Sequence, residues 1–209
     1  MLRNIKDITN VLYINLESRT DRKKHVEEQL GNIGLSPTRF NAIKMERGAL
    51  GCSQSHLHCL LKAKENNWSH IMICEDDVLF TNPKLFVDQF NKFLAKCHEW
   101  DVVLLAGNNR SAYKRIDETC VQVYDCQTAT AYLVKEHYYD TLIKNFEESY
   151  ENLEKNPDKY RFYALDQYWK NLQKTDKWLL VTPLTITQRA DHSDIEKIFV
   201  NYGGAMLHL

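Results

Sequence analysis

Three carboxylates in a row, Glu75, Asp76 and Asp77, follow the apolar residues 71–74, and the chain turns apolar again at 78–80. This pattern predicts a buried strand with acids at its carboxyl end. Like charges held together repel one another and are costly to desolvate, so a divalent cation or a cationic partner favours such a cluster. The triplet therefore indicates a metal or ligand site. A polar turn before a helix is the other interpretation, and Asn82 and Pro83 would suit it.

Composition limits the classes of partner. The 209 residues, 44% of them hydrophobic, are enough for one compact domain. The formal net charge of -1 gives no overall attraction to nucleic acid or to anionic membranes, so we expect no nucleic-acid partner. Residues 1–10 lack the apolar core of a signal peptide, and no apolar run approaches the roughly 20 residues of a membrane span. We expect a cytoplasmic protein without an integral membrane segment.

The six cysteines are scattered through the sequence, without a CxxC pair. In an intracellular chain this spacing favours reduced structural thiols over disulfides or a zinc site.

Apolar runs alternate with helical patterns in the first half of the chain. We expect strands at 11–16, 37–43, 71–74 and 101–106. The first helix, 20–30, should end at Gly31, and Ser53 should cap a second helix that follows the loop 44–51. A third helix should begin after Pro83. The alternation predicts an α/β fold with a largely parallel sheet in this half, and ligands in such sheets bind at the carboxyl ends of the strands.

The second half is more mixed. We expect strands at 121–124, 130–134 and 178–181, and a helix that carries the apolar residues between Tyr138 and Phe146. The polar stretch 147–159 predicts a frayed helix end or a surface loop, and Leu165 and Leu172 predict one further helix. No repeat or low-complexity linker marks a domain boundary.

Several of these segments, taken in order, resemble glycosyltransferase family 25, which includes lipopolysaccharide glycosyltransferases and collagen galactosyltransferases. The segments that carry the resemblance are residues 11–19 (VLYINLESR) with Arg22, residues 39–43 (RFNAI), residues 51–56 (GCSQSH) and residues 73–78 (ICEDDV). Weaker similarities occur at residues 130–134, at Asp166 and at residues 188–195. The resemblance implies a GT-A (Rossmann-like) fold with a mixed, mainly parallel sheet flanked by helices. It also implies a UDP-sugar donor, usually a UDP-hexose, and a divalent metal, typically Mn²⁺.

By the same resemblance, residues 1–209 would form a single GT-A domain. Its 1–107 half would bind the nucleotide sugar, and its 108–209 half would bind the acceptor. The chain is short for the family, so it could be one module of a longer protein. Its richness in Lys, Asn and Tyr is similar to that of family members in large DNA viruses.

The acidic triplet has a chemical role in such a transfer. A metal that bridges the diphosphate oxygens neutralises the charge that grows as the glycosidic bond breaks. Carboxylate oxygens suit Mn²⁺ or Mg²⁺. By resemblance to the DxD motif, Asp77 would bind the metal, and Glu75 or Asp76 would lie nearer the ribose or the transferred sugar. A Glu at the first position departs from strict DxD, so whether Glu75 also binds the metal stays open.

A second metal ligand could come from the C-terminal part, where His192 is the candidate. The alternative is that Ser193 and Glu196 form a capping box and leave His192 exposed before a short helix.

Further candidates would hold the donor. The loop from Asn15 to Arg22 follows the first strand, and its arginines could pair with phosphate, or they could be solvated charges at a helix start. Ser55 and His56 would lie at a helix N-terminus that binds anions, unless Ser simply caps the helix. The complete set of donor-site candidates is Asn15, Leu16, Arg19, Arg22, Arg39, Asn41, Ala42, Ser55, His56, Glu75 and Asp76.

Catalysis by an inverting transferase needs a base for the acceptor hydroxyl, and Asp166 is the candidate. In a retaining enzyme Asp166 would instead orient the acceptor, and a salt-bridged or capping Asp is the structural alternative. The predicted function is transfer of a hexose or deoxyhexose from a UDP-sugar to a glycan or glycoprotein acceptor. The alternative is a non-catalytic module that binds nucleotide sugars or glycans. A nucleotidyltransferase would need a Gly-rich loop after the first strand, and residues 15–22 contain no glycine.

Overall fold

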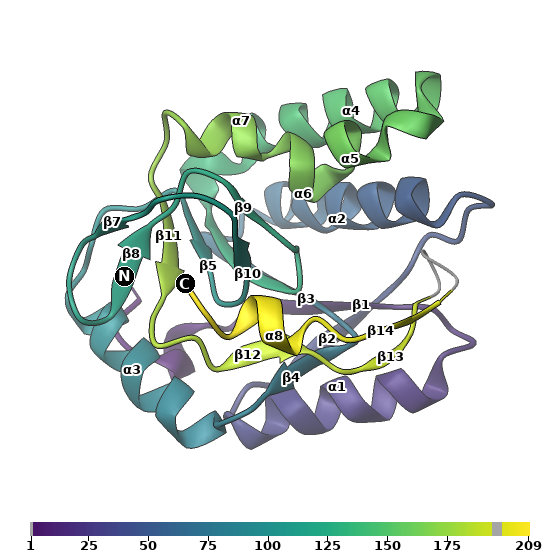
Figure 1. Ribbon diagram of the computed structural model, residues 1–209. Helices are drawn as coiled ribbons and strands as arrows, with labels where there is room; N and C mark the ends of the chain where they lie inside the picture. Colours follow the sequence, from purple (N-terminus) through teal and green to yellow (C-terminus); the bar gives the residue numbers. More distant parts are fainter. Residues whose placement is uncertain (1, 194–197) are drawn as a thin grey trace.

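An eight-stranded sheet organises the chain in the computed structural model, which describes residues 2–193 and 198–209 (Figure 1). Its strand order is β2-β1-β3-β10-β5-β11-β8-β7. The strands are β1 (Val11–Asn15), β2 (Thr38–Asn41), β3 (His70–Glu75), β5 (Val102–Leu104), β7 (Lys114–Arg115), β8 (Cys120–Gln122), β10 (Ala131–Lys135) and β11 (Trp178–Val181).

The directions of the strands confirm a mixed, mainly parallel sheet. β1 pairs in parallel with both β2 and β3, and β5 pairs in parallel with β11. β10 lies antiparallel between β3 and β5, and β8 lies antiparallel between β11 and β7. All strands except β10 and β8 therefore run the same way. The carboxyl ends of β1, β2 and β3 consequently meet at one edge of the sheet.

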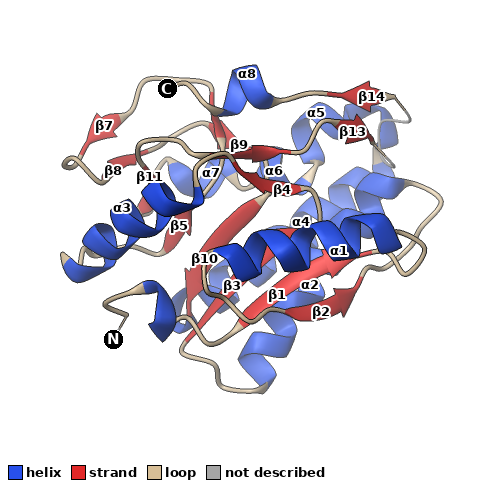
Figure 2. Ribbon diagram, turned by 90° about the horizontal axis from the view of Figure 1, so that it is seen from below, coloured by secondary structure: helices blue, strands red, loops and turns tan. Residues whose placement is uncertain are grey.

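Helices cover both faces of the sheet. In Figure 1, α1 (Thr20–Asn32) and α3 (Pro83–Ala95) lie below it, and Figure 2 shows the same two helices in front of the strands. On the opposite face, α2 (Gly48–Glu65) packs against α4 (Tyr139–Lys155). The short helices α5 (Tyr160–Tyr163), α6 (Leu165–Tyr168) and α7 (Lys170–Gln173) extend this second layer.

Smaller elements connect the C-terminal part to the sheet edge. β4 (Val78–Phe80) pairs with β12 (Ile186–Gln188), so the chain just after the acidic triplet lies beside the C-terminal segment. The remaining elements are β6 (Asn108–Asn109) paired with β9 (Cys126–Gln127), β13 (Asp191–His192) paired with β14 (Phe199–Val200), α8 (Gly203–Met206) and the 3-10 helices Ile5–Asp7, Glu136–Tyr138 and Pro157–Lys159.

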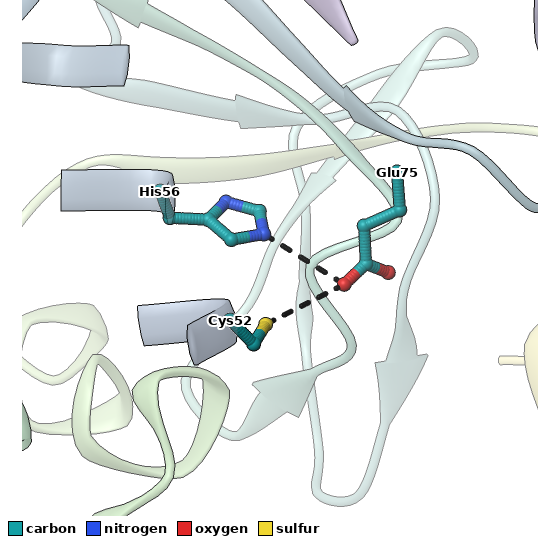
Figure 3. Close-up of side chains that lie close together, drawn as sticks. All are labelled: Cys52, His56 and Glu75. Carbon is teal, nitrogen blue, oxygen red and sulfur yellow. Dashed lines mark hydrogen bonds and ion pairs between the residues drawn. The ribbon is translucent and has the colours of Figure 1, made fainter. Parts of the chain in front are cut away.

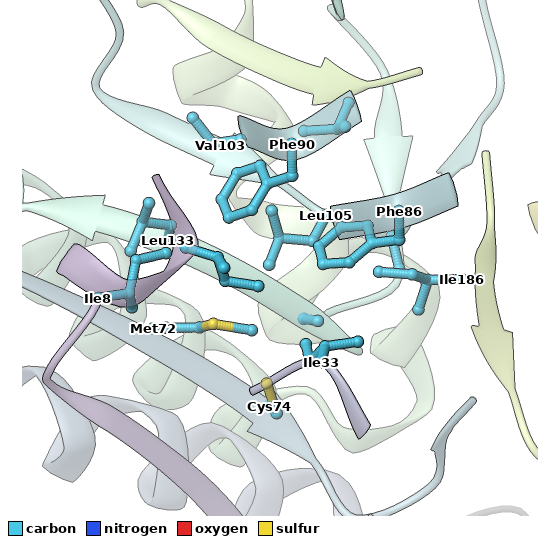
Figure 4. Packing of buried hydrophobic residues seen from close by; sticks show 14 of the residues in the cluster. Ile8, Ile33, Met72, Cys74, Phe86, Phe90, Val103, Leu105, Leu133 and Ile186 are labelled. Atoms are coloured by element: carbon cyan, nitrogen blue, oxygen red, sulfur yellow. The ribbon is translucent and has the colours of Figure 1, made fainter. Parts of the chain in front are cut away.

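The sheet separates two apolar clusters, because successive strand residues point to opposite faces. In β1, Val11 and Tyr13 belong to the cluster between the sheet and helices α1 and α3. Leu12 and Ile14 belong to the cluster between the sheet and helices α2 and α4. Figure 4 shows the first cluster, where Phe86 and Phe90 from α3 pack over the strands. Burial on both faces explains why these strands read as continuous apolar runs.

Several expected element boundaries were wrong. α1 continues to Asn32, and the left-handed residue that follows it is Gly34, at φ 79°, rather than Gly31. α2 begins at Gly48, so Ser53 is not its cap: its hydroxyl bonds the Ala49 carbonyl one turn back.

In the second half, most of the stretch predicted as a frayed end or loop, 147–159, continues α4 as far as Lys155. The helix expected around Leu165 and Leu172 divides into α6 and α7. Within the described residues, no helix is both long and apolar enough to cross a membrane.

Candidate functional site at the carboxyl edge of the sheet

The ends of β1, β2 and β3 bring the predicted residues together. β1 ends at Asn15, β2 at Asn41 and β3 at Glu75, and Ile14 is in register with Glu75. The Glu75 backbone N–H donates to the Thr130 carbonyl at 2.8 Å, just before β10 begins. The acidic triplet therefore lies at the edge where ligands bind in open α/β sheets.

Asp76 is held by donors from the first-strand loop. Asn15 Nδ2 donates to Asp76 Oδ2 at 2.7 Å, and Arg22 Nη1 donates to Asp76 Oδ1 at 3.1 Å. Burial raises the pKa of Asp76, against the opposing effects of the Asn15 hydrogen bond and the Arg22 charge. Both carboxylate oxygens are engaged within the protein, so Asp76 connects the loop after β1 to the end of β3.

One carboxylate oxygen of Asp77 lacks a hydrogen-bond donor among the described residues. Its Oδ2 lies 3.5 Å from Arg22 Nη1, but its buried Oδ1 has no hydrogen-bond partner among the described residues. Burial, followed by the charge of Glu75, raises the pKa of Asp77 well above its ordinary value, and Arg22 opposes this shift only in part. A buried carboxylate oxygen without a donor is costly, and a divalent cation would satisfy it. The chemistry of Asp77 thus fits the metal that the resemblance implies.

The C-terminal segment closes over Arg22. Arg22 Nε lies 3.2 Å from Asp191 Oδ2, and Arg22 Nη2 donates to the His192 carbonyl at 3.1 Å. Arg19 Nη2 also reaches Asp191 Oδ2, at 3.0 Å. Burial alone would raise the pKa of Asp191, but the His192 backbone N–H and three arginines outweigh it and lower this pKa. The arginines predicted to meet phosphate are therefore paired with protein carboxylates in this structure.

His192 contributes its backbone carbonyl to this contact, and the residue itself is exposed. The acid that faces the arginines is its neighbour Asp191. Ile195 and Glu196, which belonged to the expected C-terminal motif and capping box, lie outside the described residues.

Glu75 faces a second group of side chains, shown in Figure 3. Its Oε1 lies 3.7 Å from His56 Nε2 and 3.9 Å from Cys52 Sγ, both of which point from α2 towards that oxygen. Its Oε2 accepts a hydrogen bond from Gln188 Nε2 at 3.0 Å. Cys52, His56 and Glu75 place three potential ligand atoms within 4.8 Å of one another.

His56 is fully buried, and a hydrogen bond at Nδ1, the ring nitrogen that does not face Glu75, fixes its orientation. His56 Nδ1 and the Tyr132 hydroxyl are hydrogen-bonded at 2.8 Å, while His56 Nε2 has no hydrogen-bond partner in the described part of the chain. Burial first, and then the charges of Glu75, Asp166 and Asp77, raise the pKa of the Cys52 thiol well above its ordinary value. The thiol is therefore protonated at neutral pH and does not add to the negative charge of the site.

The GCSQSH motif is helical throughout, which corrects the expectation that Ser55 and His56 lie at a helix N-terminus. Ser55 Oγ donates to the Gly51 carbonyl at 2.7 Å and accepts from the Ile43 N–H at 2.9 Å. A Cβ on Gly51 would lie 2.4 Å from the Ile43 carbonyl oxygen. The motif thus fixes α2 against the segment after β2, and this contact positions Cys52 and His56.

The predicted nucleoside-pocket residues are in contact with one another. Arg39 Nε donates to Asn15 Oδ1 at 3.1 Å, and Arg39 Nη2 donates to Asn41 Oδ1 at 3.0 Å. The Ala42 N–H donates to the Asn15 carbonyl at 3.0 Å. Leu16 is half-buried, and its carbonyl accepts from the Arg19 N–H.

Asp166 approaches the site from the helical layer. Its Oδ2 accepts the Thr128 N–H at 3.0 Å. Burial raises the pKa of Asp166, the Thr128 hydrogen bond opposes this, and the charge of Glu75 raises it further. A carboxyl group whose pKa is raised towards neutrality suits general acid or base work.

Four residues at the site were not singled out from the sequence. Gln188 and Asp191 lie in a segment that carried a family similarity, so a signal for them existed. Cys52 lies in the GCSQSH motif but was treated as a structural thiol. Thr130, buried with an unpartnered hydroxyl oxygen beside Glu75, lies in the weaker family similarity at residues 130–134 but was read only as part of a strand.

Comparison with known proteins adds a family match. Residues 44–140 match the model of glycosyltransferase family 25 (LPS biosynthesis protein), which confirms the resemblance over that stretch. The matched stretch includes the acidic triplet, Cys52 and His56, and it supports glycosyltransferase activity. That family implies a sugar donor and a glycan acceptor. No curated protein matches the chain.

Solved structures with similar folds include three transferases. A glycosyltransferase involved in the glycosylation of the major capsid of PBCV-1 is 10% identical with a TM-score of 0.43, and the match covers 84% of this chain and 92% of that one. GlyE from Streptococcus pneumoniae TIGR4 is 10% identical with a TM-score of 0.48, over 85% of this chain and 46% of that one. Mannose-1-phosphate geranyltransferase from Thermus thermophilus is 9% identical with a TM-score of 0.46, over 83% of this chain and 73% of that one.

Proposed function

We propose that this chain, whose residues 44–140 match glycosyltransferase family 25, is a metal-dependent glycosyltransferase. It would move a hexose or deoxyhexose from a UDP-sugar to a glycan or glycoprotein acceptor. The observation that carries the proposal is the unpartnered Oδ1 of Asp77 at the carboxyl edge of the sheet, next to Glu75. That oxygen supports a cation site at the place where a nucleotide sugar would bind.

Asp77, with Glu75 beside it, would hold Mn²⁺ or Mg²⁺, while His192 stays a candidate ligand only if its exposed ring turns inward. When bound, the metal would withdraw charge from the leaving diphosphate. Arg22 and Arg19 would exchange their contacts with Asp191 for contacts with the donor phosphates, since phosphate oxygens match the guanidinium fork. Asn15, Arg39, Asn41 and Ala42, together with Leu16, would line the nucleoside pocket.

Asp166 would take the proton of the acceptor hydroxyl as that oxygen attacks the sugar. Its raised pKa supports this role, because a base whose pKa lies nearer to neutral is a stronger proton acceptor. His56 would stay buried behind Glu75, where its Nε2 can hold the Oε1 side of that carboxylate in place. In a retaining reaction, Asp166 would orient the acceptor hydroxyl instead.

A second candidate function is a non-catalytic module that binds nucleotide sugars. Arg22 favours it, because its guanidinium already offsets part of the charge of Asp76 and Asp77 without any metal. Such a module would bind UDP-sugars with the same affinity in the presence and absence of Mn²⁺.

UDP release separates the two functions. The protein would be incubated with a panel of UDP-hexoses and UDP-deoxyhexoses, with Mn²⁺ or with EDTA, and UDP would be measured. A transferase releases UDP from at least one donor in Mn²⁺ and not in EDTA. Tight UDP-sugar binding with no release from any donor would favour the module.

A further inference from the structure

A groove of about 690 Å³ opens in the helical layer, on the side of α5, α6 and α7 that faces the turn after β8. Aromatic side chains form much of its wall. Phe162 is 70% exposed, and Tyr124, Tyr163 and Tyr168 are half-buried around it. Exposed aromatic groups in a concave surface are typical of binding sites, and the apolar face of a sugar ring packs well on such rings.

Cations surround these rings. Lys159, Arg161 and Lys174 are exposed in the groove, and none of them makes a salt bridge with a described carboxylate. Arg161 Nε donates to the Tyr160 hydroxyl, and Lys174 Nζ donates to Asn171 Oδ1 at 3.4 Å. The fourth cation, Lys170, is paired with Asp125, the carboxylate that lines the groove. The groove is therefore positive in a chain whose net charge is -1.

The groove adjoins the proposed catalytic base. Gln167, which lines it, is the residue after Asp166. Lys170 Nζ donates to Gln127 Oε1 at 2.9 Å, and the next residue, Thr128, donates its N–H to Asp166. The segment 125–128, which includes β9, thus connects the groove, lined by Asp125, to Asp166, which accepts the Thr128 N–H. A saccharide seated in the groove could present a hydroxyl near Asp166.

We propose that this groove is the acceptor subsite and that the acceptor is an anionic saccharide, one that carries carboxylate or phosphate groups. The inference rests on the proposed transferase function. The aromatic rings would pack against sugar rings, and the unpaired cations would pair with the acidic groups. A neutral glycan would leave Lys159, Arg161 and Lys174 without anionic partners, so charge complementarity favours the acidic one.

Binding can be tested without turnover. Titration calorimetry would compare the full chain with tetragalacturonate and with a neutral galactose tetrasaccharide, at low and at moderate salt. We expect the acidic tetramer to bind more tightly and its affinity to fall as salt rises. Equal affinity for the two tetramers, or no binding of either, would overturn the inference.

Variants locate the site. The double variant Arg161→Glu, Lys174→Glu should weaken tetragalacturonate binding about tenfold or more, because two attractive charges at exposed positions become repulsive. Phe162→Ala should weaken both tetramers. The control is Lys24→Glu, which reverses one charge at an exposed lysine of α1 on the opposite face of the sheet. It should leave the binding of both tetramers unchanged. Unchanged binding in the double variant would place the acidic ligand elsewhere.

Donor measurements keep this test separate from that of the function. In the groove variants, UDP-sugar affinity and acceptor-independent UDP release should equal those of the wild type, while KM for an acidic acceptor rises. If the wild type releases no UDP but still prefers tetragalacturonate, the transferase proposal fails and the groove remains a site for acidic saccharides. If UDP is released and the preference is absent, the groove assignment fails alone.

Discussion

Arg22 and Asp77 lie 3.5 Å apart at the carboxyl edge of the sheet, but this contact does not fully offset the negative charge of the site. Arg22 also forms ion pairs with Asp76 and Asp191, so its single positive charge is shared among three carboxylates. Asp77 Oδ1 has no hydrogen-bond donor among the described residues. The site can therefore hold one more cation. The stability of the protein towards unfolding should change when a charge at this site is removed.

Asp77→Asn should stabilise the protein in the absence of metal, by about 1 kcal/mol. The pKa of Asp77 is raised in the folded state, so its ionised form, which prevails at high pH, opposes folding. The amide removes that charge while keeping the size of the side chain. Thermal unfolding at neutral pH in EDTA measures the effect, and Mn²⁺-dependent UDP binding should disappear in the same variant.

Asp88→Asn is the matched control, because Asp88 is an exposed carboxylate of α3. It should leave both the unfolding temperature and UDP binding unchanged. Mn²⁺-dependent UDP binding that persists in Asp77→Asn would remove Asp77 from the metal site.

Metal affinity should depend on pH in a defined direction. Since the folded-state pKa of Asp77 lies above its ordinary value, a cation must displace a proton from this carboxyl wherever the pH lies below that raised pKa. Mn²⁺ should therefore bind more weakly as pH falls through this raised pKa, with protons released on binding. Calorimetry in two buffers of different ionisation enthalpy measures the release, and a pH-independent affinity without proton release would contradict the assignment.

Arg22→Met should destabilise the protein by about 3 kcal/mol, because removal of one partner leaves buried carboxylates uncompensated. The Arg22 side chain is only 9% exposed, so solvent screens the loss little. Mn²⁺ should restore part of the lost stability, since a cation at Asp77 offsets the same charges. Denaturant unfolding with and without Mn²⁺ measures both effects.

Arg19→Met serves as the comparison, because Arg19 is more exposed and pairs with Asp21 and Asp191 rather than with the triplet. Its cost should be smaller, and Mn²⁺ should not recover it. Equal rescue of the two variants would mean that the metal binds away from Asp77.

Gly51→Ala should cost about 1–3 kcal/mol, the range for overpacking of a close contact. The new methyl carbon would lie 2.4 Å from the backbone carbonyl oxygen of Ile43. A backbone atom cannot move away from this contact as easily as the end of a side chain can. Gly31→Ala is the control: it adds a methyl group to α1 with nothing within 4 Å, so it should stabilise the helix slightly. A Gly51→Ala protein as stable as the wild type would contradict the close packing of α2 on the segment after β2.

These glycines also show what the sequence could and could not predict. Strand ends were predictable, because the apolar runs of β1 and β3 stop at Asn15 and Glu75, and the polar residues at those ends meet at one edge. The start of α2 was not, because glycine disfavours a helix locally and the reason for Gly51 is a contact with residue 43.

The pairing of Arg22 with Asp191 was equally hidden, since it depends on the C-terminal segment returning to lie beside the triplet. The pairing of β12 with β4 shows that return. Local pattern thus predicts which side chains reach the edge, whereas the charges that meet them there are set by long-range packing.

Asp166→Asn should leave UDP-sugar affinity nearly unchanged and slow transfer about 10²–10⁴-fold, the range for loss of a general base. The wild-type rate should rise with pH through the raised pKa of Asp166, because only the ionised carboxylate accepts a proton, and the variant should lose this dependence. Asp140→Asn, at an exposed position of α4, is the control for a lost carboxylate. Wild-type turnover in Asp166→Asn would exclude Asp166 as the base, and a raised KM for acceptor with unchanged kcat would give it the orienting role.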